Sequence, residues 1–311
     1  MAIVAPNSMD FTNKNINMII TGLPSTGKTT LALSAPKPLL ADFDEGLSRV
    51  NAEHRKDASV CKTYEEFLAD IKEAEGKYET IVIDTCGALI EALKDWAMRT
   101  DPKASKNNGG FSLQGYGIVK QEFLRLSNYL RKHFNTVYIF HENIERNGDD
   151  GIFYQIVVEG ATRSLVFQPC DVAAHLFMQK GKRYAGFTPT EQYNAKSAYG
   201  IKGVIEIPEL KEGDANNFLT TLFDKIRANL AAEVKSLDAD KAKYDEAMRR
   251  GMSCINSLDP DHPEYIEACV EEIKQIDHAL TSKKELQAAL KKRLDDLFVF
   301  DKESRTYSKK V

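Results

Sequence analysis

The fold of this chain follows from one stretch, Met18-Ile19-Ile20-Thr21-Gly22-Leu23-Pro24-Ser25-Thr26-Gly27-Lys28-Thr29-Thr30. Its apolar start predicts a strand around residues 17 to 21, and the residues after Gly27 predict a helix to about Ser34, before Pro36. Between the two, the residues fit the pattern G-x-x-x-x-G-K-[ST] at every fixed position. Glycines let the backbone fold around an anion, and the following helix presents unpaired N–H groups to it. The stretch therefore predicts a binding site for a nucleoside triphosphate.

The side chains of this loop have expected roles at the nucleotide. Lys28 supplies a positive charge for the β- and γ-phosphates, and the Thr29 hydroxyl is placed to help hold Mg²⁺. The whole loop is expected to line the nucleotide, through Gly22, Leu23, Pro24, Ser25, Thr26, Gly27, Lys28, Thr29 and Thr30.

Composition limits the class of protein. A chain of 311 residues is long enough for one substantial core and an appendage. The formal net charge of −4 argues against a uniformly basic nucleic-acid binder, although it allows a local basic groove. No apolar run approaches the roughly 20 residues that span a bilayer, and no charged and apolar leader begins the chain. We therefore expect a cytoplasmic protein with no membrane partner.

Acidic residues follow the second predicted strand. The apolar residues from Pro38 to Ala41 predict this strand, and Asp42, Asp44 and Glu45 come at its end. In an open α/β sheet, ligands lie beyond the carboxyl ends of the strands, so one of these acids could activate water or organise a metal ion. The alternative is a solvated turn in which the acids cap a following helix.

Two later strands also end in polar residues. Residues 80 to 85 predict a buried parallel strand closing on Asp84, which is expected to be a second contact to Mg²⁺. Residues 136 to 140 predict another strand, ending at His141. A polar side chain there could sense the γ-phosphate, although a lone histidine is more often an interior group. Helices are expected at residues 63 to 76, 89 to 98 and 119 to 132.

The stretch from Asp101 to Gly117 shows no helical or strand periodicity, and long stretches of this kind are usually functional or disordered. Its candidates for binding and stacking single-stranded nucleic acid are Lys103, Lys106, Phe111 and Tyr116. A surface loop without function is the equal alternative.

The part from Glu145 to Ile207 alternates short strands with turns, which predicts an antiparallel edge on the parallel core. Arg183, Lys196 and Lys202 are candidates for a cation that reaches into a neighbouring subunit's nucleotide. As solvated surface charges they would need no such role.

Helical periodicity follows Pro208. It predicts helices from near Asp214 to Leu230, from about 239 to 256, and from 263 to about 297 with a break near Thr281. This pattern is typical of a helical hairpin or short coiled coil, serving as an oligomerisation or partner-binding arm or as a plain packing appendage. The polar residues 301 to 311 predict a mobile tail.

The order of these signals supports a family comparison. Four stretches resemble, in sequence order, the elements of a RecA-like ATPase core: Gly22 to Thr30, Ala41 to Gly46, Ile81 to Thr85 and Ile139 to Glu142. With Gln114-Gly115-Tyr116-Gly117 and residues 196 to 201, the chain resembles the phage-encoded AAA-type nucleotide-binding proteins related to Sak-type single-strand annealing recombinases. The resemblance covers residues 15 to 210 and implies ATP and Mg²⁺ as ligands.

The resemblance also implies roles for single residues. Asp44 falls where RecA-like enzymes carry a catalytic glutamate, and His141 falls where they carry a polar sensor, often Gln. Since Asp44 has the shorter side chain, Glu45 could replace it. The catalytic set is then Lys28, Asp44, Glu45, Asp84 and His141, with Thr29 and Asp84 at the metal.

The predicted protein is an ATPase with a RecA-like P-loop α/β core, whose mostly parallel sheet is flanked by helices, and a C-terminal helical extension. Its predicted parts are a flexible lead-in (1–14), the core (15–210), the helical extension (211–300) and a mobile tail (301–311).

We expect it to assemble with copies of itself and to act on single-stranded DNA in phage recombination, annealing or replication. A single-strand-binding protein or another replication partner would contact the C-terminal helices. The alternatives are a nucleotide-gated scaffold for a protein partner and a small-molecule phosphotransferase.

Overall fold

The computed structural model describes residues 13–106, 108–147, 151–158, 167, 170–302 and 305–310. By internal contacts it divides into two units, with the division between Asn229 and Leu230. Most of the predicted lead-in lies outside the described residues. No helix within the described ranges is long and apolar enough to cross a membrane.

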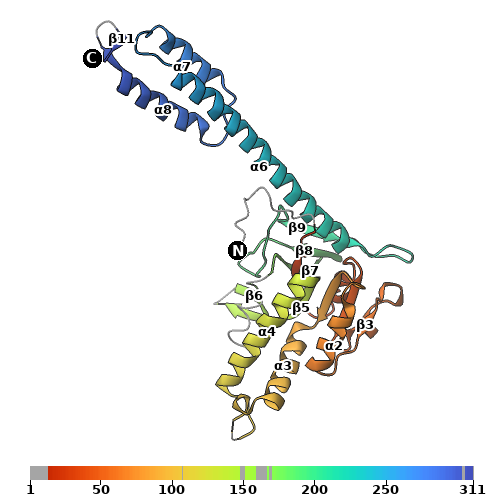
Figure 1. Ribbon diagram of the computed structural model, residues 1–311. Coiled ribbons are helices and arrows are strands. Elements are labelled where there is room, and N and C mark those ends of the chain that lie inside the picture. The colour runs from red at the N-terminus through yellow and green to blue at the C-terminus, as the bar shows by residue number, and fades with distance from the viewer. Residues whose placement is uncertain are drawn as a thin grey trace. The chain divides into compact units, whose positions relative to one another are not determined.

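The first unit, which ends at Asn229, contains the large sheet of Figure 1. Its strands are β1 (Asn17–Gly22), β2 (Pro38–Asp42), β3 (Ala58–Ser59), β4 (Thr80–Asp84), β5 (Asn135–Asn147), β6 (Gly151–Ile156), β7 (Val172–Gln179), β8 (Lys182–Gly186) and β9 (Val204–Ile207). Its helices are α1 (Lys28–Ala32), α2 (Tyr64–Ala74), α3 (Cys86–Thr100), α4 (Leu113–His133) and the first turns of α6 (Phe218–Asn256).

The strands follow the order β3-β2-β4-β5-β1-β7-β8-β9, and β6 pairs with β5. All neighbours from β3 to β7 in this order are parallel. In contrast, β6, β8 and β9 are antiparallel to their partners. This confirms the predicted α/β fold with a mostly parallel sheet and an antiparallel edge. It also puts one strand, β5, between the loop-bearing β1 and β4, which ends in Asp84.

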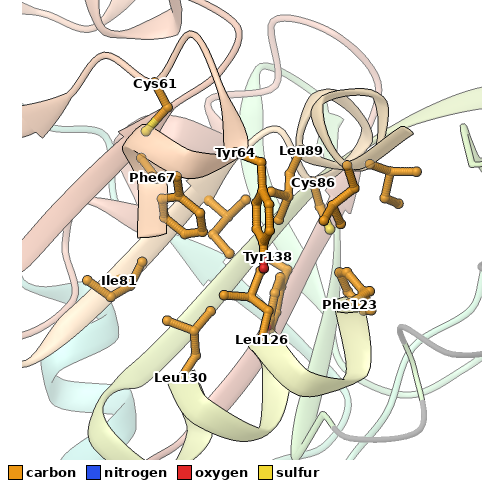
Figure 2. Packing of buried hydrophobic residues seen from close by; sticks show 14 of the residues in the cluster. Cys61, Tyr64, Phe67, Ile81, Cys86, Leu89, Phe123, Leu126, Leu130 and Tyr138 are labelled. Atoms are coloured by element: carbon orange, nitrogen blue, oxygen red, sulfur yellow. The ribbon is translucent and has the colours of Figure 1, made fainter. Parts of the chain in front are cut away.

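One face of the sheet packs against α2, α3 and α4. Figure 2 shows Ile81 and Tyr138 of the sheet among Phe67, Leu89 and Phe123 of the three helices. Every residue of β1, β2 and β4 is buried, as expected for strands that are covered on both faces. The near-continuous apolar runs of the sequence therefore arise from this double coverage.

The start of α6 is bonded to the rest of the first unit. Leu219 donates its backbone N–H to Ser34 Oγ at 2.9 Å, and Arg227 donates from Nη2 to Asn135 Oδ1 at 3.0 Å. These contacts join the first turns of α6 to the segment after α1 and to the start of β5.

Capping residues fix where α2 and α4 begin. Thr63 and Glu66 form a capping box at α2, which confirms the helix predicted there. Ser112 Oγ accepts the Gly115 N–H at 2.9 Å and caps α4. The predicted irregular stretch from Asp101 to Gly117 is therefore too long, because its last residues form the first turn of a helix.

Three other predictions need correction. His141 does not end its strand: β5 continues to Asn147, because β6 pairs with the extension from Glu142 onward. The two helices predicted between residues 214 and 256 form one continuous helix, α6. The polar tail predicted from residue 301 contains a strand, β11 (Thr306–Lys309), which pairs with β10 (Phe298–Asp301).

The second unit contains the rest of α6, α7 (Tyr265–Gln275), α8 (Ser282–Leu297) and the β10–β11 hairpin. It has its own apolar core, formed by residues that include Ile255, Ile273, Leu286 and Phe298. Gly251 allows close packing there, because a Cβ at this position would lie 2.4 Å from Leu286 Cδ1.

Candidate nucleotide-binding site

The loop after β1 requires glycine at two positions. A Cβ on Gly22 would lie 2.7 Å from the Leu176 carbonyl oxygen, so only glycine fits beside β7. Gly27 has φ +85°, a left-handed conformation that glycine adopts without strain. Thr26 Oγ1 donates to the Leu23 carbonyl at 2.9 Å and closes the loop from inside. The pattern found in the sequence is thus a turn built by these glycines at the end of the central strand.

Lys28 points its ammonium into this loop. Its Nζ donates to the carbonyl oxygens of Gly22 at 3.0 Å and of Leu23 at 2.8 Å. Burial lowers the pKa of Lys28, and the nearby charges of Asp84 and Glu142 act in the opposite direction. The ammonium has three N–H donors, so two bonds to carbonyls leave one donor within the loop for a phosphate oxygen.

Thr29 joins the loop to the end of β4. Its hydroxyl donates to Asp84 Oδ2 at 2.6 Å. Asp84 is only 4% exposed, and burial raises the pKa of its carboxyl, while the Thr29 hydrogen bond lowers it and the charge of Asp42 raises it further.

These two side chains fit Mg²⁺, which prefers hard oxygen ligands and takes its remaining positions from water and substrate phosphates. The described residues contain no cluster of three or more histidine, cysteine or acidic side chains that could enclose a metal ion. A Mg²⁺ ion held by these two oxygens would take its other ligands from water and from substrate phosphates.

The three acids at the end of β2 and just after it are in different environments. Asp42 is buried, and its carboxylate accepts the N–H groups of Gly46 at 2.7 Å and Leu47 at 3.1 Å. It thus caps the short helical turn Gly46–Arg49, which is the capping role given above as the alternative. Glu45 is exposed, with φ +51°, and within the described residues its carboxylate makes no hydrogen bond or ion pair.

Asp44 is the acid of this group that faces other candidate residues. Its Oδ2 lies 3.7 Å from His141 Nε2 and 3.4 Å from Arg49 Nη1. Its charge also acts on Lys28 and Asp84. The structure therefore groups Asp44 with the loop and with the end of β4, and it leaves Glu45 outside this group.

His141 lies beside the loop, because β5 pairs it with Gly22 of β1. Burial lowers the pKa of His141, the Lys28 charge lowers it further, and Asp44 raises it. Its Nδ1 is buried with no hydrogen-bond partner among the described residues. At neutral pH the imidazole is thus mainly uncharged, with one nitrogen toward Asp44.

A buried pair beside His141 was missed from the sequence. Glu142 Oε2 lies 2.9 Å from His175 Nδ1, and both side chains are at most 2% exposed. His175 stacks on Tyr193, with ring centroids 4.2 Å apart. Residues so distant in the chain meet because β1, which pairs with β5 and β7, lies between them. Only the strand order could have revealed this pair.

The three candidate cations do not share one place. Lys196 donates from Nζ to the Cys170 carbonyl, so it is engaged within its own chain. Lys202 is exposed. Arg183 instead lies against the loop of its own chain, because a Cβ on Gly27 would be 2.8 Å from Arg183 Cζ.

Comparison with known proteins identifies the family of this site. Residues 14–199 match the model of a family described as "AAA domain", and this range is more than half of the chain. The chain belongs to the AAA domain family. The matched part of this AAA domain protein includes the loop, Asp84, His141 and Arg183. The loop after β1 is thus the P-loop expected of a nucleotide-binding NTPase of this family. No curated protein matches the chain.

Among solved structures, the AAA domain protein is similar to the crystal structure of the flagellar accessory protein FlaH from Methanocaldococcus jannaschii. The two are 12% identical, and the match covers 62% of this chain and 90% of that one, with a TM-score of 0.30. A similarity at this TM-score supports no further argument.

Proposed function

We propose that this protein binds ATP together with Mg²⁺ and hydrolyses it. The observation that carries the proposal is the hydrogen bond of 2.6 Å between Thr29 of the loop and the buried Asp84 at the end of β4. It brings the two predicted metal ligands together although 55 positions separate them in the sequence.

Each residue of the site would have its own role in hydrolysis. When bound, Mg²⁺ would neutralise charge on the phosphates, and the oxygens of Thr29 and Asp84 would hold it. Lys28 would turn its ammonium from the loop carbonyls to the β- and γ-phosphate oxygens, where it stabilises developing negative charge. Asp44 would accept a hydrogen bond from the attacking water and orient it, with His141 beside it.

Lys28→Ala tests this function directly. The variant should fold, because it loses only a side chain in the loop, yet it should bind ATP much more weakly and hydrolyse none. Lys77→Ala is the matched control, since Lys77 is an exposed lysine paired with Glu73 and far from the loop in sequence. Calorimetric titration with ATP and a phosphate-release assay give the two readouts. Parent activity in Lys28→Ala would show that the loop is not the active site.

We further propose that the ATPase acts on single-stranded DNA in recombination, annealing or replication. This proposal is supported by the turn between α3 and α4, where Lys103 and Lys106 are exposed, and by Leu113 at the start of α4, which is 87% exposed. Tyr116 supports it less than the sequence suggested, because it packs edge-on against Phe111 with ring centroids 4.9 Å apart. Phosphate contacts by the lysines would make binding depend on salt.

The DNA proposal is tested by fluorescence anisotropy of a labelled oligonucleotide at two salt concentrations, with and without ATP and Mg²⁺. We expect tighter binding with ATP and weaker binding by the double variant Lys103→Ala/Lys106→Ala. If the parent protein does not bind the oligonucleotide at low salt, the DNA role is excluded and a nucleotide-gated scaffold or a phosphotransferase becomes the better description. The same proposal includes two further points: the protein assembles into a homo-oligomer, and a replication partner binds α6 to α8.

A further inference from the structure

Arg183 is placed on the loop by the antiparallel edge of the sheet. β7 runs parallel to β1, and β8 returns antiparallel to β7 with Arg183 opposite Met178. The guanidinium thereby reaches Gly27: an added Cβ there would be 2.8 Å from Cζ and 2.9 Å from Nε. Only a glycine leaves room for a planar cation so close to the loop backbone.

Within the described residues, the Arg183 guanidinium has no counter-ion. Arg183 Nε is buried without a hydrogen-bond partner, and among the described residues no carboxylate forms an ion pair with this arginine. The adjacent Lys182, in contrast, pairs with Glu206 at 2.8 Å. A buried donor without an acceptor is costly, and an arginine so placed suits an anion that arrives from outside.

A cavity beside Arg183 gives such an anion access. It has a volume of about 360 Å³, and its lining includes Thr30 of the loop, Ile205 and Phe218 together with Arg183. None of the described residues that line it is acidic. The cavity therefore adjoins the last residue of the loop without a negative charge that would repel phosphate.

We infer that Arg183 binds a phosphate oxygen of the nucleotide held by the loop of its own chain. The inference rests on the proposed ATP binding and adds a residue to that site. It replaces the expectation from sequence that this arginine serves a neighbouring subunit. The guanidinium offers the phosphate a fork of N–H donors with a fixed geometry, which the ammonium of Lys28 does not.

The affinity of single-site variants tests the contact. Arg183→Gln and Arg183→Ala should bind ATP and ADP about 10- to 100-fold more weakly than the parent, as expected for loss of a charged hydrogen bond. Adenosine, which has no phosphate, should bind each variant and the parent equally. Lys182→Ala is the control that removes a neighbouring charge of the same strand, and it should bind ATP as the parent does. Thermal unfolding of each variant checks the fold, and Arg183→Lys should fall between parent and Arg183→Gln.

Mixing variants distinguishes the two possible directions of the contact. The mixture is assayed at an ATP concentration well below the dissociation constant of Arg183→Ala, where neither variant alone hydrolyses ATP appreciably. If Arg183 served the neighbouring subunit, a mixture of Lys28→Ala and Arg183→Ala chains would restore ATP hydrolysis, because one interface would carry both intact residues. For a contact within one chain, no mixture restores it. Restored activity, or unchanged ATP affinity in Arg183→Gln, would overturn the inference. The proposed function is tested separately, since it requires only that Lys28→Ala loses ATP binding.

Discussion

At the scale of single residues, Asp84 links function to stability. Burial raises the pKa of its carboxyl above the ordinary value of 3.8, so the folded state binds a proton more readily than the unfolded chain. As pH rises from this ordinary value through the higher folded pKa, the unfolding free energy must fall. Above that window the buried charge destabilises the ligand-free protein by a constant amount.

Asp84→Asn should therefore raise the melting temperature at neutral pH, because it removes the buried charge and keeps an oxygen for the Thr29 hydroxyl. The gain should shrink as pH is lowered toward the ordinary carboxyl pKa, where the parent becomes protonated as well. ATP hydrolysis should be strongly reduced, with a weaker dependence on Mg²⁺. Thermal unfolding of both proteins over a pH series measures the first effect. A stability difference that does not change with pH would contradict the assignment of the pKa shift to Asp84.

The neighbouring acids Asp44 and Glu45 should differ in their effect on turnover. Asp44 lies 3.7 Å from His141, whereas Glu45 is exposed. Asp44→Asn should keep the parent affinity for ATP and lose about 100-fold or more in hydrolysis rate, as for other positioned acids and bases. Glu45→Gln is nearly isosteric and should hydrolyse ATP at close to the parent rate. Steady-state phosphate release compares the two, and equal rates would move the water-positioning role to another acid such as Glu142.

The sequence could predict that Lys28 and Thr29 lie in the loop, because the fixed spacing of the motif places them there. It could also predict that Asp84 lies near the loop, because Asp84 ends a parallel strand. It could not separate Asp44 from Glu45, since that choice depends on the backbone of one turn, where Glu45 has φ +51°. Nor could it predict that Arg183 lies on the loop of its own chain. That contact depends on how β8 pairs beyond β7, which is a property of the sheet.

At the scale of elements, the start of α4 contains two glycines in different surroundings. A Cβ on Gly115 would be 2.7 Å from Phe111 Cζ and 2.9 Å from the Ala104 carbonyl oxygen. A Cβ on Gly117 would meet no atom within 4 Å. One glycine is therefore needed for close packing, and the other only lowers helix propensity.

Opposite effects on stability are expected from two alanine substitutions in this helix. Gly115→Ala should destabilise the protein by about 1–3 kcal/mol, because the backbone of Ala104 cannot give way as a side-chain end could. Gly117→Ala should stabilise it by up to about 1 kcal/mol through helix propensity. Urea unfolding of both variants, followed by circular dichroism, provides the comparison. If both substitutions stabilise the protein, the contact of Gly115 is not as close as described.

Element boundaries show where sequence patterns are insufficient. α4 was predicted to begin too late because Gly115 and Gly117 weaken the helical pattern that the Ser112 cap starts. α6 was divided in two because no residue between Leu230 and Ala247 is buried, so no apolar periodicity marks that part of the helix. Apolar periodicity reflects burial, and a stretch of helix that buries no residue shows no such periodicity.

At the scale of the whole molecule, the proposed nucleotide site belongs to one unit. Its residues, from Gly22 to Arg183, all precede the division at Asn229. The part of α6 that belongs to this unit ends with Asn229, and its buried residues are Leu219, Leu222, Phe223 and Ile226. The second unit has an apolar core of its own. Two separate cores imply that each unit can keep its fold without the other.

A chain that ends at Lys235 should therefore bind ATP with the affinity of the full-length protein. The cut retains every buried residue of the first turns of α6 and falls where the helix is solvent-exposed, so it opens no apolar core. If the second unit is an arm for assembly or for a partner, the shortened chain should also differ from the parent in oligomeric state, or fail to bind that partner. Titration calorimetry measures ATP affinity, and light scattering after gel filtration measures the mass with and without ATP. A folded, shortened chain that no longer binds ATP would show that residues after 235 contribute to the site, because none of the residues assigned to it has been removed.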